Sequence, residues 1–274
     1  MRWFLLVAVV ACSSNEPNRT EIGPVFDRAL PIVDLLVEVT VVADGDSFRV
    51  VANGEELEVR LLGINAPELG ECYGPESATW LTETIEGKDV GLALEPEPDQ
   101  FGRVLAVAIV DQVDVNKDAL KSGHAVVVNG EGIDWTSYVA AEEEARSAET
   151  GMWADDICGA SGPRAAVGIE SVEFDPPGPG QREAVIIINN GNDDIDVGGF
   201  VLRDESSVNR FVLPAEILAA GSRLEIAVME CRFDKAYSPL VWCSDQPVFN
   251  NDGDTAMLLD PFGRVIALSR YRLP

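Results

Sequence analysis

The dipeptide Asn53-Gly54 is the feature that most restricts how this chain can fold, because it is the strongest short signal for a β-hairpin. Strand-like sequence lies on both sides of it, at residues 47–52 before the turn and residues 55–64 after it. Asparagine and glycine accept the left-handed backbone that a two-residue turn requires. The sequence therefore predicts an antiparallel pair of strands early in the chain.

The other elements of this region favour a small barrel. Further strands are expected at residues 33–42, 89–96 and 104–110, and helices at residues 75–87, 115–123 and 137–151. Five strands with helices placed late fit a closed barrel of the oligonucleotide-binding (OB) type. Strands and helices alternate too rarely for a doubly wound parallel sheet. We therefore expect a mainly β fold that opens with a five-stranded OB-type barrel and three helices.

A second domain is expected after the barrel. The chain has 274 residues, which exceeds the usual size of a single domain. Small residues near position 160 separate the barrel from a region of short strands and frequent turn residues, which is typical of an antiparallel sandwich. We assign residues 32–159 to the barrel and residues 160–274 to an antiparallel β-sandwich.

The N-terminus has the pattern of an export signal. An apolar run follows Arg2 and ends in small residues before Cys12, and it is too short to span a bilayer. The four residues that end at Cys12 resemble a bacterial lipobox, whose cysteine is lipidated after cleavage; the alternative is a secretory cysteine that matches by chance. Residues 1–12 are assigned as a lipoprotein signal peptide and residues 13–31 as a flexible tether. This predicts an exported protein, held by lipid at the outer membrane or the cell surface.

The four remaining cysteines are expected to form disulfides. They contain no C-x-x-C pair and His124 is the only histidine, so a zinc site is disfavoured. An exported chain meets an oxidising compartment, in which cysteines pair. With one pair in each domain, the expected disulfides are Cys72 with Cys158 and Cys231 with Cys243.

Acidic, amide and basic side chains gather around the predicted hairpin. Carboxylates and an amide oxygen form a hard oxygen site that suits calcium, and an arginine beside it binds phosphate through two nitrogens. Together they are the parts of metal-assisted phosphodiester hydrolysis: a cation at the phosphate, a carboxylate that orients or deprotonates water, and arginines that stabilise transition-state charge. The residues that would supply these parts are Asp46, Arg60, Asn65, Glu68 and Arg103.

Four segments, in this order, resemble the staphylococcal nuclease family. They are Asp44 to Ser47, Arg60 to Glu68, Phe101 to Arg103, and Val115 to Ala125. The resemblance extends over residues 36–158 and implies an OB-type barrel with nuclease activity, a nucleic acid substrate and calcium as the cofactor.

The same resemblance implies two groups of functional residues. The calcium-binding group is Asp46, Asn65 and the backbone carbonyl of Ala66, with Asp44 in the outer coordination shell. The catalytic group is Glu68, as general base or water-orienting residue, with Arg60 and Arg103 on the scissile phosphate. Secreted members of the family also pair the cysteines that correspond to Cys72 and Cys158, which supports the first disulfide.

Three features depart from the family pattern. Asn65 stands where a second aspartate is usual, and the loss of one negative charge is expected to weaken calcium binding. Phe101 replaces a tyrosine and so lacks its hydroxyl. Residues 126–132 carry none of the tyrosines that often lie beside the nucleotide, so base stacking there is not expected.

The second domain resembles the lamin-tail domain, an immunoglobulin-like module. The order of its strand and turn segments matches from Ile186 to Gly263. In bacteria this module often accompanies secreted nucleases and is taken to bind or anchor. The resemblance implies no catalytic residue in this domain and does not indicate its partner.

The charge of the chain opposes nucleic acid binding. It has 47 acidic and 20 basic residues, and residues 31–159 carry 27 and 7 of these. Phosphate neutralisation dominates affinity for nucleic acid, so this domain should repel its substrate at long range. Charges are screened within about 3 Å at 1 M salt. The 16 arginines against 4 lysines would suit a salt-adapted organism, although an acidic surface also simply aids solubility.

The sequence thus predicts an exported, lipid-anchored and monomeric nuclease that hydrolyses DNA or RNA with calcium. The alternative is a degenerate barrel that serves as a binding or scaffold module of the cell envelope, with Asn65 and Phe101 as its marks. Two other features have ordinary structural explanations. The acidic run Glu142 to Glu144 is expected to be a solvated helix face, and His124 is expected to cap or pack.

Overall fold

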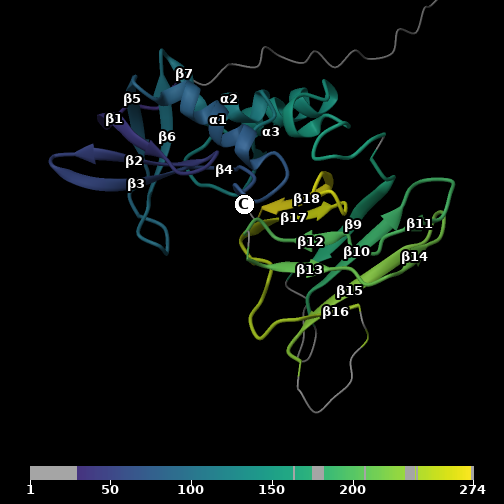
Figure 1. Ribbon diagram of the computed structural model, residues 1–274. Helices are drawn as coiled ribbons and strands as arrows, with labels where there is room; N and C mark the ends of the chain where they lie inside the picture. Colours follow the sequence, from purple (N-terminus) through teal and green to yellow (C-terminus); the bar gives the residue numbers. More distant parts are fainter. Residues whose placement is uncertain are drawn as a thin grey trace, which may run out of the picture.

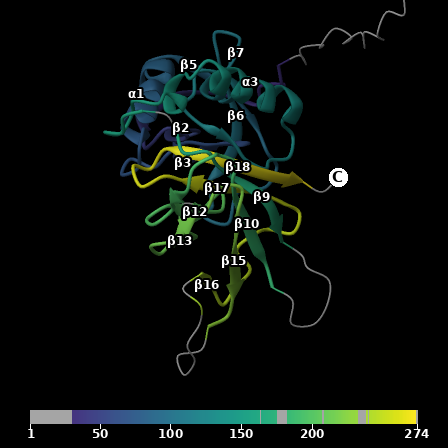
Figure 2. The same cartoon turned by 90° about the vertical axis from the view of Figure 1, so that its right-hand side faces the viewer.

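The computed structural model describes residues 30–162, 164–174, 182–206, 208–231, 238 and 240–272. Cys12 and almost all of the predicted tether lie outside these residues. The described chain forms a barrel with helices and, beside it, a β-sandwich (Figures 1 and 2). In the described part of the chain, every helix is too short or too polar to cross a membrane.

The first domain contains eight strands, three α-helices and one 3-10 helix. They are β1 (Leu35–Val42), β2 (Ser47–Ala52), β3 (Glu55–Leu61), β4 (Ile64–Asn65), α1 (Gly74–Ile85), β5 (Asp89–Leu94), β6 (Val104–Val110), β7 (Val113–Asp114), α2 (Val115–Lys121), β8 (Val126–Val127), α3 (Trp135–Ser147) and η1 (Gly151–Trp153). The sheet order is β3-β2-β1-β5-β6-β7, and a parallel pairing of β3 with β6 closes it. The predicted five-stranded barrel is therefore confirmed.

The β2–β3 hairpin forms where the sequence places it. Asn53 and Gly54 both have positive φ angles, 53° and 85°, so each occupies the left-handed region that this turn requires. The antiparallel register sets Ala52 opposite Glu55 at the turn and Ser47 opposite Arg60 at the far end. Because the turn fixes this register, it also fixes which side chains meet at the open end of the hairpin.

The last helix differs from its predicted bounds. It begins at Trp135 because the side chain of Asp134 caps it, accepting a hydrogen bond from the Ser137 amide. It ends at Ser147, because Glu149 has a φ angle of 50°, which helical residues do not adopt. The prediction placed the end of this helix at Gly151, whereas the helix ends before the left-handed residue Glu149.

In the residues that the structure describes, the second domain consists of strands and connecting loops. They are β9 (Val167–Glu173), β10 (Ala184–Asn189), β11 (Ile195–Asp196), β12 (Val201–Arg203), β13 (Arg210–Val212), β14 (Ile217–Leu218), β15 (Arg223–Met229), β16 (Val241–Cys243), β17 (Gly253–Leu259) and β18 (Val265–Arg272). They form two four-stranded sheets, β16-β15-β10-β9 and β13-β12-β17-β18, and a small β11-β14 pair. Buried residues from both larger sheets, among them Ile187 and Leu258, share one core. This is the expected sandwich.

The two domains share a hydrophobic interface. Val126, Met152 and Trp153 of the barrel domain pack with Met257 and Val265 of the β17–β18 hairpin, which faces the barrel in both views (Figures 1 and 2). This contact makes the hairpin part of a core that neither domain could bury alone.

A buried ion pair crosses the same interface and corrects the prediction for Glu142. Its side chain is fully buried, accepts a 2.7 Å hydrogen bond from the Val127 amide, and pairs with Arg270 of β18. Arg270 also donates to the Val127 carbonyl at 3.1 Å. Glu142 is therefore not on a solvated helix face, because the second domain covers it and supplies its counter-charge.

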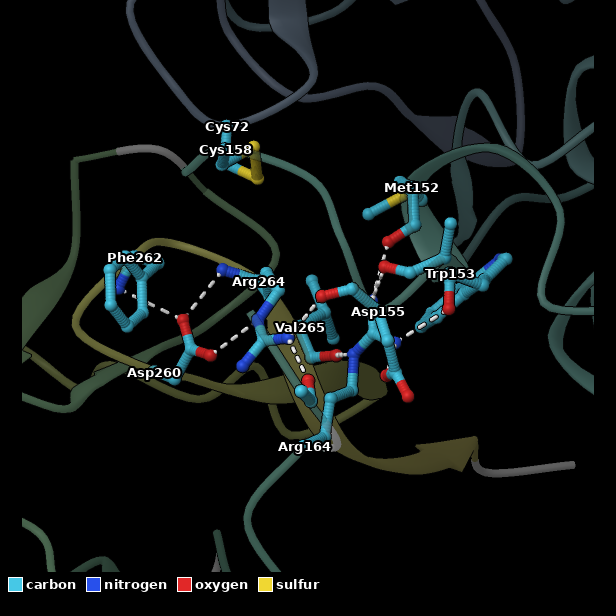
Figure 3. A network of polar contacts seen from close by, with 12 residues as sticks. Cys72, Met152, Trp153, Asp155, Cys158, Arg164, Asp260, Phe262, Arg264 and Val265 are labelled. Carbon is cyan, nitrogen blue, oxygen red and sulfur yellow. Dashed lines mark hydrogen bonds and ion pairs between the residues drawn. A yellow bond between two sulfur atoms is a disulfide. The ribbon is translucent and has the colours of Figure 1, made fainter. Parts of the chain in front are cut away.

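Arginines also fasten the segment that joins the domains. Arg164 donates to the carbonyls of Met152, Ala154 and Val265, and Arg264 donates to Asp155 and pairs with Asp260 at 2.7 Å (Figure 3). These contacts link the end of the barrel domain to the β17–β18 hairpin. The junction of small residues near position 160 is thus held by hydrogen bonds on both sides.

Two disulfides complete the fold, and they are the pairs expected from the sequence. Cys72 bonds to Cys158, which ties the loop before α1 to the end of the barrel domain (Figure 3). Cys231 bonds to Cys243 within the sandwich. Each bond therefore lies within one domain.

Candidate active site

The turn between β1 and β2 forms one wall of the candidate site. Asp44 Oδ1 accepts a 3.0 Å hydrogen bond from the Asp46 amide, which fixes the turn. A Cβ atom at Gly45 would lie 2.6 Å from Ser77 Cβ and 2.7 Å from Ala66 Cβ, so a larger residue would push the turn away from its neighbours. The glycine therefore allows Asp46 to lie against α1 and against the segment that follows β4.

Asp46 is the buried acid of the site. Its Oδ2 atom accepts a 2.6 Å hydrogen bond from the Ala66 amide, and its Oδ1 atom accepts a 3.0 Å bond from the Ser47 hydroxyl. Burial raises the pKa of Asp46 to about 7, while the positive charge of Arg60 opposes that rise. The carboxyl group is therefore poised to exchange its proton near neutral pH.

Arg60 lies at the open end of the hairpin, opposite Ser47, and joins the acid to the amide of the site. Its Nη2 atom lies 3.2 Å from Asp46 Oδ2 and 2.9 Å from Asn65 Oδ1. Its Nη1 atom donates to the Leu61 carbonyl at 2.8 Å. A carboxylate oxygen and an amide oxygen thus converge on one cationic nitrogen.

This convergence fits a hard cation. Calcium prefers carboxylate, amide and carbonyl oxygens, of which Asp46 and Asn65 supply the first two. The Ala66 carbonyl remains the predicted third ligand. Asp44 accepts a hydrogen bond from the Asp46 amide and so lies next to the predicted ligands. Within the described residues, no three His, Cys, Asp or Glu side chains are grouped to hold a metal, so the ligand set here has a single buried carboxylate.

Glu68 lies on the exposed loop between β4 and α1. Its amide donates to Glu71 Oε2 at 3.1 Å, and its carbonyl accepts from the Glu71 amide at 2.8 Å. A Cβ atom at Gly74 would lie 1.8 Å from the Glu68 carbonyl oxygen, so the loop rests directly on the start of α1. Among the described residues, the Glu68 carboxylate makes no hydrogen bond or ion pair. It is a solvent-facing carboxylate on a fixed backbone.

Arg103 is paired with an acid of its own turn. It precedes β6, whose parallel pairing sets Leu105 beside Arg60, so it lies at the edge of the same region. Its Nε atom pairs with Asp99 Oδ2 at 2.7 Å, and its guanidinium lies 5.5 Å from the ring centre of Phe101. The contact with Asp99 uses one nitrogen of the Arg103 guanidinium.

Three charged residues that were not among the predicted site residues meet beside the site, and two of them belong to the second domain. Glu71 Oε1 lies 2.6 Å from Arg210 Nη2 and 3.6 Å from Arg203 Nη1. A small cavity between the domains is lined by Asn65, Glu71 and Arg203, among others. Glu71 could have been noticed as an acid three positions after Glu68, but the sequence carries no signal that brings the arginines here.

A further acid of the second domain lies near Arg60. Glu205 accepts a hydrogen bond from the Asn129 amide at 3.3 Å. Burial raises the pKa of Glu205 to about 8, Asp254 adds to the rise, and Arg60 opposes it. The sandwich therefore takes part in the electrostatics of the candidate site.

The fold and the site together define a class: an OB-type barrel with an acid, amide and arginine cluster at the end of a hairpin, followed by a β-sandwich. The family model described as Staphylococcal nuclease homologue matches residues 58–155, and the Lamin Tail Domain model matches residues 160–272. The chain belongs to the staphylococcal nuclease homologue family and carries a lamin tail domain after the nuclease domain.

Relatives in bacteria agree with this assignment. An uncharacterized endonuclease of Escherichia coli is 30% identical over 132 residues, which cover 48% of this chain and 85% of the relative. The micrococcal nuclease of Shigella flexneri is 30% identical over 133 residues, covering 44% and 75%. An uncharacterized endonuclease of Haemophilus influenzae is 31% identical over 116 residues, covering 42% of this chain and 64% of the relative. The chain thus spans less than two thirds of the Haemophilus protein.

Proposed function

We propose that this chain is an exported, lipid-anchored nuclease that hydrolyses phosphodiester bonds of DNA or RNA and depends on calcium. One observation carries the proposal: oxygens of Asp46 and Asn65 converge on the cationic Nη2 atom of Arg60, and Glu68 lies on the neighbouring loop. The family membership and the relatives named endonuclease support the same activity.

The residues divide the reaction between them. Asp46, Asn65 and the Ala66 carbonyl would hold calcium, which when bound neutralises phosphate charge and stabilises the transition state. Glu68 faces solvent, so its carboxylate orients a water molecule and accepts its proton as the oxygen attacks phosphorus. Arg60 donates its N–H groups to the phosphate oxygens, and the partly exposed Arg103 joins it once the Asp99 pair opens. The leaving oxygen departs on the side opposite the attacking water.

The test is cleavage of single-stranded DNA and RNA by the purified chain, with calcium and with a chelator. Glu68→Gln should lower kcat by at least about a hundredfold, because general-base catalysis contributes that much or more. Glu58→Gln, at an exposed glutamate on β3, is the matched control and should leave kcat unchanged. Cleavage that persists in chelator, or that survives Glu68→Gln, would refute the proposed mechanism.

A second function is favoured by a specific observation. Arg103 is already paired with Asp99, and Asn65 takes the place of an acid, so the barrel has fewer free charges for catalysis than the family pattern provides. A degenerate barrel would bind calcium or oligonucleotide without cutting. Calorimetric binding of either ligand, together with no cleavage by the folded wild-type chain, would identify this function.

The proposed anchor rests on the N-terminal sequence, because Cys12 lies outside the described residues. Expression in a bacterium with labelled palmitate should place label on the wild-type chain and not on a Cys12→Ser variant. Label on both variants, or on neither, would argue against lipidation at Cys12. An exported protein also meets the oxidising conditions in which Cys72 and Cys158 remain bonded.

A further inference from the structure

The lamin tail domain contacts the loop that carries Glu68. Arg210, at the start of β13, lies 2.6 Å from Glu71 Oε1 through its Nη2 atom. Arg203, at the end of β12, lies 3.6 Å from the same oxygen. The exposed fractions of these side chains are 12% for Glu71, 4% for Arg203 and 36% for Arg210. The contact is thus mostly shielded from water, and a shielded ion pair holds its partners more firmly than an exposed one.

The other oxygen of the same carboxylate reaches Glu68. Glu71 Oε2 accepts a 3.1 Å hydrogen bond from the Glu68 amide. One carboxylate therefore bridges the arginines of the tail domain and the backbone of the proposed general base. Arg203 also lies close enough to Glu68 for the negative charge of Glu68 to act on the pKa of Arg203, which it raises against the lowering caused by burial.

Two further contacts hold this loop. Cys72, next to Glu71, is bonded to Cys158. A Cβ atom at Gly263, in the turn between β17 and β18, would lie 3.0 Å from Cys72 Cβ, so the tail domain also rests on the disulfide. The loop is thus fixed at its end by the disulfide and along its length by the tail domain.

We propose that the lamin tail domain positions the proposed general base: Arg210 and Arg203 hold Glu71, and Glu71 holds the backbone of Glu68. This inference rests on the proposed nuclease function. The arginines are positioning residues, because they act on Glu68 through Glu71 and not on substrate. Since a misplacement of about 1 Å can cost about a hundredfold in rate, the position of this backbone has a direct effect on the reaction.

The test uses the full chain with three substitutions and two measurements. Arg210→Ala removes the hold on Glu71, Arg210→Lys keeps its charge, and Arg223→Ala is the matched control. Arg223 is an exposed arginine of the same domain, on β15, and it is paired at 2.5 Å with Glu170 on β9 of the same sheet. Steady-state kinetics separate kcat from KM, and hydrogen exchange of the peptide over residues 66–74 reports on the backbone of the loop that contains Glu68.

If the tail domain positions Glu68, Arg210→Ala should lower kcat by about tenfold and leave KM within about twofold. In the same variant, amide exchange over residues 66–74 should accelerate. Arg210→Lys should restore part of kcat and part of the protection from exchange, and Arg223→Ala should change neither kcat nor exchange. Unchanged or increased kcat in Arg210→Ala would overturn the inference, as would a loss carried by KM alone, which would make Arg210 a substrate contact.

Failure of the nuclease proposal would be distinguishable from failure of this inference. If the wild-type chain does not cut, the proposed function falls and the exchange measurement decides alone. Faster exchange in Arg210→Ala then still shows that the tail domain fixes the Glu68 loop, whereas exchange equal to that of the wild-type chain overturns the inference.

Discussion

Replacement of Arg270 by alanine should destabilise the whole chain, because Arg270 and Glu142 form a buried ion pair between the domains. The Glu142 side chain is fully buried, and that of Arg270 is 13% exposed. The substitution removes the charge from the β18 side and leaves the carboxylate in place inside the interface. A buried charge that loses its partner keeps the cost of its desolvation without the attraction that offset it.

The structure sets the size of this effect. Loss of one partner of a buried pair costs about 3 to 5 kcal/mol. Glu142 would keep its 2.7 Å hydrogen bond from the Val127 amide, and Arg146 would remain 3.9 Å away, which favours the low end of that range. We therefore expect the free energy of unfolding to fall by about 3 kcal/mol, and Tm by about 6 to 12 °C for a chain of this size.

Thermal and urea denaturation, followed by circular dichroism and tryptophan fluorescence, would measure the change. Arg223→Ala is the control, because its pair with Glu170 is exposed and pairs of that kind contribute less than about 1 kcal/mol. If Arg270→Ala destabilises the chain no more than Arg223→Ala does, the interface pair does not contribute as argued. Separate transitions for the two domains in the wild-type chain would also contradict the coupling.

Three further predictions follow from the site and the charge. Because burial raises the pKa of Asp46 to about 7, protons compete with calcium below that pH, so calcium affinity measured by calorimetry should fall about tenfold per pH unit below 7 and level off above it. A calcium affinity that stays constant from about pH 5.5 to about pH 8 would exclude Asp46 as the ligand that titrates. Asp99→Asn keeps the oxygen that accepts hydrogen bonds from the Phe101 and Arg103 amides but removes the ion pair with the Arg103 side chain. The Arg103 side chain is then available to the substrate, so KM for oligonucleotide should fall by up to about fivefold. A KM that rises would show that the ion pair helps substrate to bind. Since residues 31–159 carry 27 acidic against 7 basic residues, kcat/KM at fixed calcium should rise with salt toward about 1 M, whereas a steady decrease from low salt would mean that local arginines outweigh the acidic field.

Local sequence determined the centre of the candidate site. Asn53 and Gly54 define the turn, the turn sets the β2–β3 register, and that register places Arg60 opposite Ser47 and so next to Asp46. The convergence of Asp46, Arg60 and Asn65 could be predicted for this reason. These residues lie within 20 positions of one another, and short-range geometry brings them together.

Only the tertiary structure decided the partners of the remaining charges. The pair of Arg103 with Asp99 is a local exception, since the two residues are four positions apart in the same turn, and the place of Arg103 at the phosphate stays a prediction. Glu142 has the sequence environment of a solvated helix face, yet Arg270, 128 positions away, buries and neutralises it. Periodicity reports which face of an element is polar and cannot report which distant charge will cover it.

The role of the second domain shows the same division most clearly. Its strand pattern predicted a sandwich, since alternating apolar positions and turn residues are local signals. Its contact with Glu71 through Arg203 and Arg210 depends on how two finished domains pack together. Long-range electrostatic complementarity forms only when both surfaces exist, so the sequence determined each domain and the packed structure alone decided that the tail domain reaches the Glu68 loop.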